Sequence, residues 1–331
     1  MTTGTAVREL DGATLEKLVS AAVTAPSIHN TQPWRFRLDP GTTTVEVHAA
    51  PDRALNSIDA DGRSLHISAG AAVFNLRAAV AHFGWEPVVR LLPRPADPGL
   101  LAAVRPAGPR GLGERHPEAE LYGALWHRHS SRVPFTGPPV PSEIRAEIAA
   151  AAAAEDTRLV FPGERETARV LHLTAEAEWR DLADPARAAE SREWVRDSGP
   201  SGVPTAAFPS RDTTGRMPVR DFAAGLGVTP RLPEVYEQRP AVAVLGTVGD
   251  EPADWLRAGQ GMERALLVAT AHGVRASLFS QAVEWPDLRW ALRDPRGSYV
   301  HVQMVMRFGY GPEGAATPRR PVGDVLDDPG V

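Results

Sequence analysis

A run of polar side chains lies between a predicted helix and a predicted strand, in Ala25-Pro-Ser-Ile-His-Asn-Thr-Gln-Pro-Trp34. The Ser27 hydroxyl and the Asn30 amide can donate and accept hydrogen bonds at the edge of a planar heterocycle, and His29 and Gln32 share the loop with them. The same pattern is typical of a helix C-terminus followed by a turn, in which polar groups satisfy the loop backbone. The residues alone leave both interpretations open.

A basic motif, Arg128-His-Ser-Ser-Arg132, lies near the middle of the chain. Two guanidinium groups with the hydroxyl of Ser130 between them suit a phosphate with about two negative charges, because arginine makes fork-shaped, charge-assisted hydrogen bonds. A second pair, Arg319 and Arg320, follows the last predicted strand. The alternatives are a solvated basic turn at a helix C-terminus and ordinary surface charge in a tail.

The composition excludes several kinds of chemistry. The 331-residue chain has no cysteine, which rules out cysteine nucleophiles, disulfides and Cys-based metal sites. Lys17 is the sole lysine, and its surroundings fit neither a Schiff base nor a phosphate loop. His127 and His129 point apart on a helix, so we predict no metal site. With a net charge of −5, no basic block, no long apolar run and no signal-peptide layout, we expect a cytoplasmic protein that binds neither nucleic acid nor membrane.

The polar loop resembles the flavin-binding loop of the nitroreductase family, A-P-S-x-x-N-x-Q-P-W. The positions that match are Ala25, Pro26, Ser27, Asn30, Gln32, Pro33 and Trp34. The resemblance extends over most of the chain and implies FMN as the cofactor and NAD(P)H as its reductant. It also implies that the loop binds FMN through Pro26, Ser27, Asn30 and Gln32.

The resemblance assigns the remaining flavin contacts as well. Family members bind the FMN phosphate with an R-x-x-x-R-like motif and with basic residues after the last strand. The phosphate ligands implied here are Arg128, Ser130, Arg132, Arg319 and Arg320. Backbone groups after the family's fourth strand hold the flavin near N5, and Ser280 and Gln281 correspond to them. The Glu-Gly or Gly-Gly pair that the family carries at that place is absent.

Within the family, the chain resembles the Acg-like branch, in which two nitroreductase units are fused as an internal pseudo-dimer. The implied fold is α+β, with mixed, mainly antiparallel sheets flanked by helices. The first half supplies the Ser27 loop and the second the arginines, whereas the reciprocal loop is missing near residues 154–158. We therefore expect one flavin per chain, in a monomeric pseudo-dimer or a homodimer.

The implied activity is ping-pong hydride transfer from NAD(P)H through FMN to a small organic acceptor, which is a nitroaromatic, a quinone or a specific metabolite. Such a flavin-centred reaction requires no side-chain nucleophile, so we assign no catalytic side chain. The alternative is a flavin-binding or sequestering protein with a lid-covered site and little turnover.

Hydrophobic periodicity and turn residues predict the elements that position these side chains. The expected helices are residues 15–23, 62–83, 121–127, a helix starting at 142, 164–196, 252–272 and 285–293. The expected strands are residues 34–38, 43–48, 88–92, 158–161, 241–248, 276–279 and 299–308.

The two halves of the chain, residues 1–120 and 121–331, echo one another. Ser68-Ala-Gly70 and Arg257-Ala-Gly259 each open a long helix, and the intervals to the closing glycines, Gly84 and Gly273, are equal. The pattern favours an internal duplication whose halves share a long-helix interface.

Residues 199–240 are rich in proline and glycine. So long a stretch without regular structure is typical of a lid or a binding loop. We expect it to cover the flavin, latched by ion pairing of the Arg211-Asp212 and Arg220-Asp221 pairs.

Overall fold

The computed structural model describes residues 10–109, 116–228, 231–293 and 300–327. Tyr299, at which we expect the last strand to begin, lies outside the described residues, as do residues 229–230 of the predicted lid. Within the described ranges, no helix combines the length and the apolar character needed to cross a bilayer.

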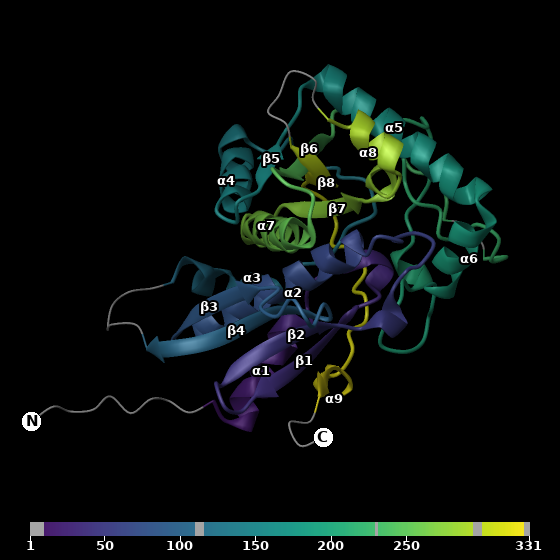
Figure 1. Cartoon of the computed structure of the whole chain (residues 1–331). Coiled ribbons are helices and arrows are strands. Elements are labelled where there is room, and N and C mark those ends of the chain that lie inside the picture. The colour runs from purple at the N-terminus through teal and green to yellow at the C-terminus, as the bar shows by residue number, and fades with distance from the viewer. Residues whose placement is uncertain (1–9, 110–115, 229–230, 294–299, 328–331) are drawn as a thin grey trace, which may run out of the picture.

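Two sheets flanked by helices make up the described part of the chain (Figure 1). The first sheet has the order β3-β4-β2-β1-β9 and the second β5-β6-β8-β7. All neighbouring strands pair antiparallel except β1 and β9, which are parallel. The predicted α+β fold with mixed, mainly antiparallel sheets is confirmed. The strands are β1 (Trp34–Asp39), β2 (Thr44–Ala49), β3 (Trp85–Leu91), β4 (Leu100–Pro109), β5 (Arg158–Val160), β6 (Ala241–Thr247), β7 (Arg275–Phe279), β8 (His301–Gly309) and β9 (Leu326–Asp327).

The longer helices lie where hydrophobic periodicity predicts them. The expected helix over 164–196 is instead two helices, because Asp184 interrupts the first and its side chain caps the second. The expected helix over 121–127 is only a short turn of helix. The α-helices are α1 (Gly12–Ala22), α2 (Arg63–His82), α3 (Tyr122–Leu125), α4 (Ser142–Ala153), α5 (Glu164–Ala183), α6 (Pro185–Glu193), α7 (Pro252–Ala271), α8 (Pro286–Ala291) and α9 (Val322–Val325).

Helices α2 and α7 lie between the two sheets and pack along each other (Figure 1). Almost all of α2 is buried, as expected for an alanine-rich helix that is apolar on every side. Its N-terminus is fixed by Asp59, whose carboxylate accepts hydrogen bonds from the amides of Ser64 (2.8 Å) and Leu65 (2.9 Å). A carboxylate there satisfies helix amides that have no partner within the helix.

The two long helices cross at Gly70 and Gly259, the matched glycines of the repeat. A Cβ added to Gly70 would overlap the carbonyl of Leu256, and one added to Gly259 would overlap the carbonyl of Ile67. The backbones therefore approach as closely as only glycine allows at both positions. This contact supports the predicted long-helix interface.

The C-terminal end of the chain returns to the first half. Strand β9 pairs with β1 at the edge of the first sheet, and the Arg320 amide donates to Gln32 Oε1 at 2.8 Å. Within the second half, Ser130 forms a parallel bridge with Ala276 at the start of β7. Segments from both ends of the sequence thus meet in the seam between the sheets.

Replacement of Gly70 by alanine tests the helix crossing. Alanine favours a helix by up to about 1 kcal/mol, but the overlap with the Leu256 carbonyl forces the helices apart. We expect Gly70→Ala to lower the free energy of unfolding by about 1–3 kcal/mol, the usual effect of overpacking, measured by denaturant titration. Gly12→Ala in α1 is the control, because an added Cβ there meets nothing within 4 Å. Equal stability of the two variants would contradict the close crossing.

Candidate functional site

A cleft with about 1010 Å³ of empty space, partly open to solvent, lies in the seam between the two halves. Its walls come from the loop after α1, the first turns of α2, the motif around Ser130, the end of β7 and the predicted lid. The lining residues are Pro26, Ser27, Ile28, His29, Asn30, Ser64, Ile67, Ser68, Ser130, Arg132, Pro209, Val219, Arg220, Phe222, Met262, Ser277, Leu278, Phe279, Ser280, Gln281, Met304, Thr317 and Arg319.

The loop after α1 forms a short 3-10 turn, η1 (Ile28–Asn30), in a backbone shape that is unusual for residues other than glycine. His29, Asn30 and Gln32 have φ angles of 46°, 53° and 51°, in the left-handed region that side chains disfavour. Ser27 Oγ accepts a hydrogen bond from the Gln32 amide at 2.9 Å. Such strain persists only when surrounding contacts fix it, and it is frequent at functional sites.

Contacts with distant segments hold this loop in place. The Asn30 side-chain amide donates to the Gly202 carbonyl (2.9 Å) and the Pro318 carbonyl (3.0 Å). The Gln32 side-chain amide donates from Nε2 to the Pro200 carbonyl at 2.8 Å. The loop is therefore tied to the lid and to the C-terminal segment at once.

Two buried guanidinium groups in the cleft have no carboxylate partner within the described ranges. Arg132 Nη1 makes no hydrogen bond there, while Arg319 donates to Asn30 Oδ1 (3.0 Å) and Thr317 Oγ1 (2.7 Å). Burial, together with the charge of Arg128, lowers the pKa of Arg132 to about 10 and that of Arg319 to about 9, although the Glu263 carboxylate opposes the shift of Arg319. Positive charge is thus held out of water with little compensation, so the cleft favours an anion.

Arg128 lies behind these two residues rather than in the cleft. Its Nε lies 3.4 Å from a carboxylate oxygen of the buried Glu263, and its Nη2 donates to the Thr24 carbonyl at 3.0 Å. Burial raises the pKa of Glu263. Within the described ranges, Arg128 thus has a carboxylate partner at ion-pair distance, which Arg132 and Arg319 lack.

The structure brings most of the predicted site residues together. Those that line the cleft are Pro26, Ser27, Asn30, Ser130, Arg132, Ser280, Gln281 and Arg319. The other three predicted residues lie behind the lining and do not face the cleft: Gln32, Arg128 and Arg320. The Gln32 Oε1 atom accepts from the Arg320 amide, and the Arg320 side chain donates to the Trp34 carbonyl at 3.3 Å.

The predicted lid covers part of the cleft, through Pro209, Val219, Arg220 and Phe222. Three of the four residues of the expected latch, Arg211, Arg220 and Asp221, form ion pairs, whereas Asp212 forms none within the described ranges. Arg211 pairs with Asp221 at 2.6 Å, whereas the Asp212 carboxylate accepts hydrogen bonds from backbone amides of the following turn.

Arg220 pairs with carboxylates outside the lid. Its guanidinium lies 2.7 Å from Glu284 and 3.6 Å from Asp181, and it donates to Ser280 Oγ at 3.4 Å. Arg187 of α6 binds the same two carboxylates, at 2.7 Å for Asp181 and 3.0 Å for Glu284. The lid is therefore fixed to α5 and to the segment after β7 by buried ion pairs.

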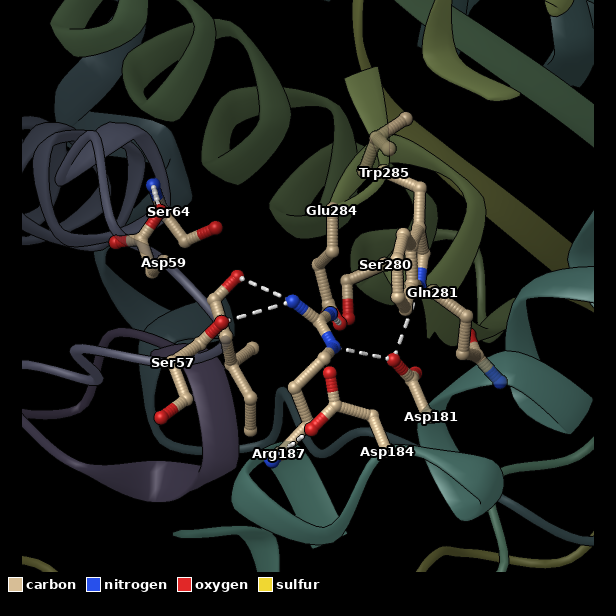
Figure 2. Close-up of polar contacts among 12 residues, drawn as sticks. Ser57, Asp59, Ser64, Asp181, Asp184, Arg187, Ser280, Gln281, Glu284 and Trp285 are labelled. Carbon is tan, nitrogen blue, oxygen red and sulfur yellow. Dashed lines mark hydrogen bonds and ion pairs between the residues drawn. The ribbon is translucent and has the colours of Figure 1, made fainter. Parts of the chain in front are cut away.

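Figure 2 shows how this ion-pair network joins the halves. Arg187 also donates to the Ser57 carbonyl of the first half at 2.9 Å, and the Trp285 indole donates to Asp181 at 3.0 Å (Figure 2). Burial raises the pKa of Asp181, and the neighbouring charge of Arg220 opposes that shift. Removal of either arginine would leave two buried carboxylates to share one guanidinium group.

Several residues that line the cleft match no sequence motif and were not predicted as site residues. His29 lies in the polar loop but matches no motif position, and Ser64 and Ser68 are hidden within an apolar helix. Phe222 and Arg220 lie in a lid without regular secondary structure, so no periodicity marks which of its side chains face inward.

No family model matches the chain. The chain is 32% identical over 330 residues to a Mycobacterium tuberculosis H37Rv protein named "Putative NAD(P)H nitroreductase Rv3131", with 96% of this chain and 92% of the relative covered. It is 29% identical over 318 residues to a second protein of that strain, "Putative NAD(P)H nitroreductase acg", with 94% and 95% covered.

Solved structures of similar chains include an FMN- and NADPH-dependent nitroreductase, NfnB, from a Sphingopyxis strain. The match has 17% identity and a TM-score of 0.37, and covers 64% of this chain and 99% of that chain. A nitroreductase from Desulfovibrio desulfuricans in complex with FMN matches with 15% identity and a TM-score of 0.37, covering 65% and 98%.

The buried ion pairs of the lid predict a large difference between two arginine variants. Arg220→Ala leaves Glu284 and Asp181 with only Arg187, so we expect a loss of about 3–5 kcal/mol in the free energy of unfolding. Arg211→Ala is the matched control, because the Arg211 side chain is 67% exposed and an exposed pair contributes less than about 1 kcal/mol. Denaturant titration measures both. Similar losses in the two variants would contradict the anchoring of the lid by Arg220.

Proposed function

Because the chain belongs to the nitroreductase family, as its sequence motifs predict, we propose that it binds one FMN in the cleft and is an NAD(P)H-dependent oxidoreductase of the Acg-like branch. The observation that carries the proposal is the pair of buried guanidinium groups, Arg132 and Arg319, neither of which forms an ion pair with a carboxylate within the described ranges. The nearby Glu263 carboxylate acts on Arg319 but lies against Arg128. An FMN phosphate brings about two negative charges, which match the surplus of positive charge on these three arginines.

The residues around these arginines suit a phosphate. Ser130 lines the same cleft as Arg132. Its hydroxyl can donate a short hydrogen bond to a phosphate oxygen. Arg319 is oriented by Asn30 and Thr317, so its guanidinium is held in place before any ligand arrives. Arg128 adds positive charge from its position behind Arg132 and Arg319. Arg320 holds Gln32 of the polar loop in place, because its backbone amide donates to Gln32 Oε1.

The other end of the cleft suits a flat ring system. Bound there, the isoalloxazine ring would accept a hydride on one face and later pass it to an oxidant. Ser27 and Ser280 keep hydroxyl hydrogens available for its polar edge, while Ile67, Met262 and Leu278 present apolar surface. Asn30 mainly holds the polar loop in place, because its side-chain amide already donates to the lid and to the C-terminal segment.

We propose a small planar acceptor, such as a nitroaromatic, a quinone or a specific metabolite. The lid narrows the cleft with Phe222 and Pro209, which favours thin molecules over bulky ones. The same lid supports the second candidate function, flavin sequestration with little turnover, because buried ion pairs hold it in the closed position.

The purified protein should be yellow and should contain at most about one FMN per chain. The second half lacks a loop equivalent to residues 25–34, so the reciprocal site cannot form. Visible flavin absorbance relative to protein concentration measures the stoichiometry. Two flavins per chain would contradict the asymmetric pseudo-dimer.

Arg132→Ala should weaken FMN binding by about 1.5–3 kcal/mol, the range for hydrogen bonds to charged groups. Arg105→Ala is the control, because the Arg105 side chain of β4 is exposed and does not line the cleft. Titration of the apoprotein with FMN, followed by flavin fluorescence, gives both dissociation constants. Unchanged affinity for Arg132→Ala would place the phosphate elsewhere.

Steady-state oxidation of NADH and NADPH separates the two candidate functions. We expect acceptor-dependent turnover with 1,4-naphthoquinone or nitrofurazone when the cleft holds FMN. Bound flavin that stays oxidised in excess NADH and NADPH would instead favour sequestration. An Arg220→Ala variant, in which the lid is released, should gain turnover if the closed lid limits access.

A further inference from the structure

His29 is the buried polar side chain of the cleft whose role no motif explains. It is only 6% exposed, it lines the cleft, and neither ring nitrogen has a hydrogen-bond partner within the described part of the chain. A buried imidazole without partners costs free energy comparable to lost hydrogen bonds. Such a group indicates that a bound molecule supplies the partner.

The position of the ring is fixed by packing and by the backbone. The His29 ring stands edge-on to Phe222 of the lid, with ring centroids 5.5 Å apart and an interplanar angle of 76°. Phe222 in turn stacks on Phe208 at 5.9 Å. With its φ of 46°, His29 occupies a strained conformation that the lid and the loop maintain together.

The charges around His29 keep its ring neutral. Burial lowers the pKa of His29 well below its ordinary value, and the positive charges of Arg220, Arg132 and Arg187 act in the same direction. A neutral imidazole has one N–H donor and one acceptor nitrogen. Arg220 and Arg187 are balanced by Asp181 and Glu284, whereas Arg132 has no carboxylate partner, so the local field favours negative charge on a ligand.

His29 lies beside the lid, against Phe222. Arg220 and Arg132 both act on His29 electrostatically. Arg220 lies 3.4 Å from Ser280 Oγ, and the Arg132 guanidinium lies 5.8 Å from the centre of the Phe222 ring. Under the proposed function, we place the ring system beside His29 and Ser280 and the phosphate beside Arg319 and Thr317, with Arg132 between them.

We propose that His29 donates a hydrogen bond to a ligand oxygen that gains negative charge on reduction. This inference rests on the proposed function. The oxygen is either a carbonyl oxygen of the flavin ring or the quinone or nitro oxygen of the acceptor. In both cases a fixed donor in a water-poor cleft stabilises the reduced form more than the oxidised one. If the oxygen belongs to the flavin, His29 sets its reduction potential. If the oxygen belongs to the acceptor, His29 is a specificity-determining residue that favours planar acceptors that carry oxygen.

His29→Phe is the decisive variant, because it keeps a ring against Phe222 and removes both nitrogens. His29→Gly is the second variant, since glycine adopts the positive φ without strain and remains informative if His29→Phe folds poorly. His172→Gln is the control, because His172 is exposed on α5. FMN content and thermal unfolding are measured first for each protein.

Two measurements distinguish the sources of the oxygen. If it belongs to the flavin, both His29 variants should lower the reduction potential of bound FMN by an amount that corresponds to about a tenfold change in equilibrium, roughly 30 mV for two electrons. If it belongs to the acceptor, the potential stays constant and reoxidation of the reduced protein by 1,4-naphthoquinone slows about tenfold. Reoxidation by ferricyanide, which needs no hydrogen bond, should not change in that case.

The inference is overturned if FMN binds and both His29 variants match the His172→Gln control in potential and in reoxidation by naphthoquinone. That result would leave the proposed function intact. A wild-type protein that takes up no FMN would instead refute the proposed function itself, and with it the role of His29.

Discussion

The architecture of the cleft depends on how closely α2 and α7 approach each other at Gly70 and Gly259. Backbone carbonyls occupy the space that side chains would fill, and a close-packed interior does not tolerate a change in that spacing. Since each helix packs on its own sheet, their separation fixes the distance between the two sheets. The cleft lies in the seam that this distance leaves at one end of the helix pair, lined by Ser64 and Ser68 of α2 and by Met262 of α7.

Charge divides the cleft and its walls into two unequal ends. At one end, Arg128, Arg132 and Arg319 face a single buried carboxylate, that of Glu263. At the lid end, the positive charges of Arg187 and Arg220 meet three carboxylates, those of Asp181, Glu284 and Glu178. Burial raises the pKa of Glu178 and of Asp181, and three carboxylates facing two guanidinium groups leave no surplus of positive charge at the lid end. This charge distribution favours an elongated ligand whose anionic end points toward Arg319.

Sequence analysis succeeds where a local pattern decides the structure. Periodicity locates α2 and α7, and the match of Gly70 with Gly259 indicates their interface. It misses β4, whose Leu-Leu-Ala-Ala start does not alternate between apolar and polar residues, and it misses β9, a pair of residues that becomes a strand only beside β1. The loop and arginine motifs identify the cleft, and Arg220 belongs to the expected latch, but its partner Glu284 lies far away along the chain and was not predicted. Long-range pairing of this kind leaves no local signal.

The contacts of the lid indicate that it forms a wall rather than a flap. Asn30 and Gln32 hold its first residues by their side-chain amides, and Tyr236 near its end donates to the Arg132 carbonyl at 2.9 Å. Between these points, Arg220 is bound to Glu284 and Asp181. Opening the whole segment would break all of these contacts and leave carboxylates buried without a counter-charge, which is costly. The lid therefore preorganises the same loop and arginine motifs that it covers, while part of the cleft mouth stays open to solvent.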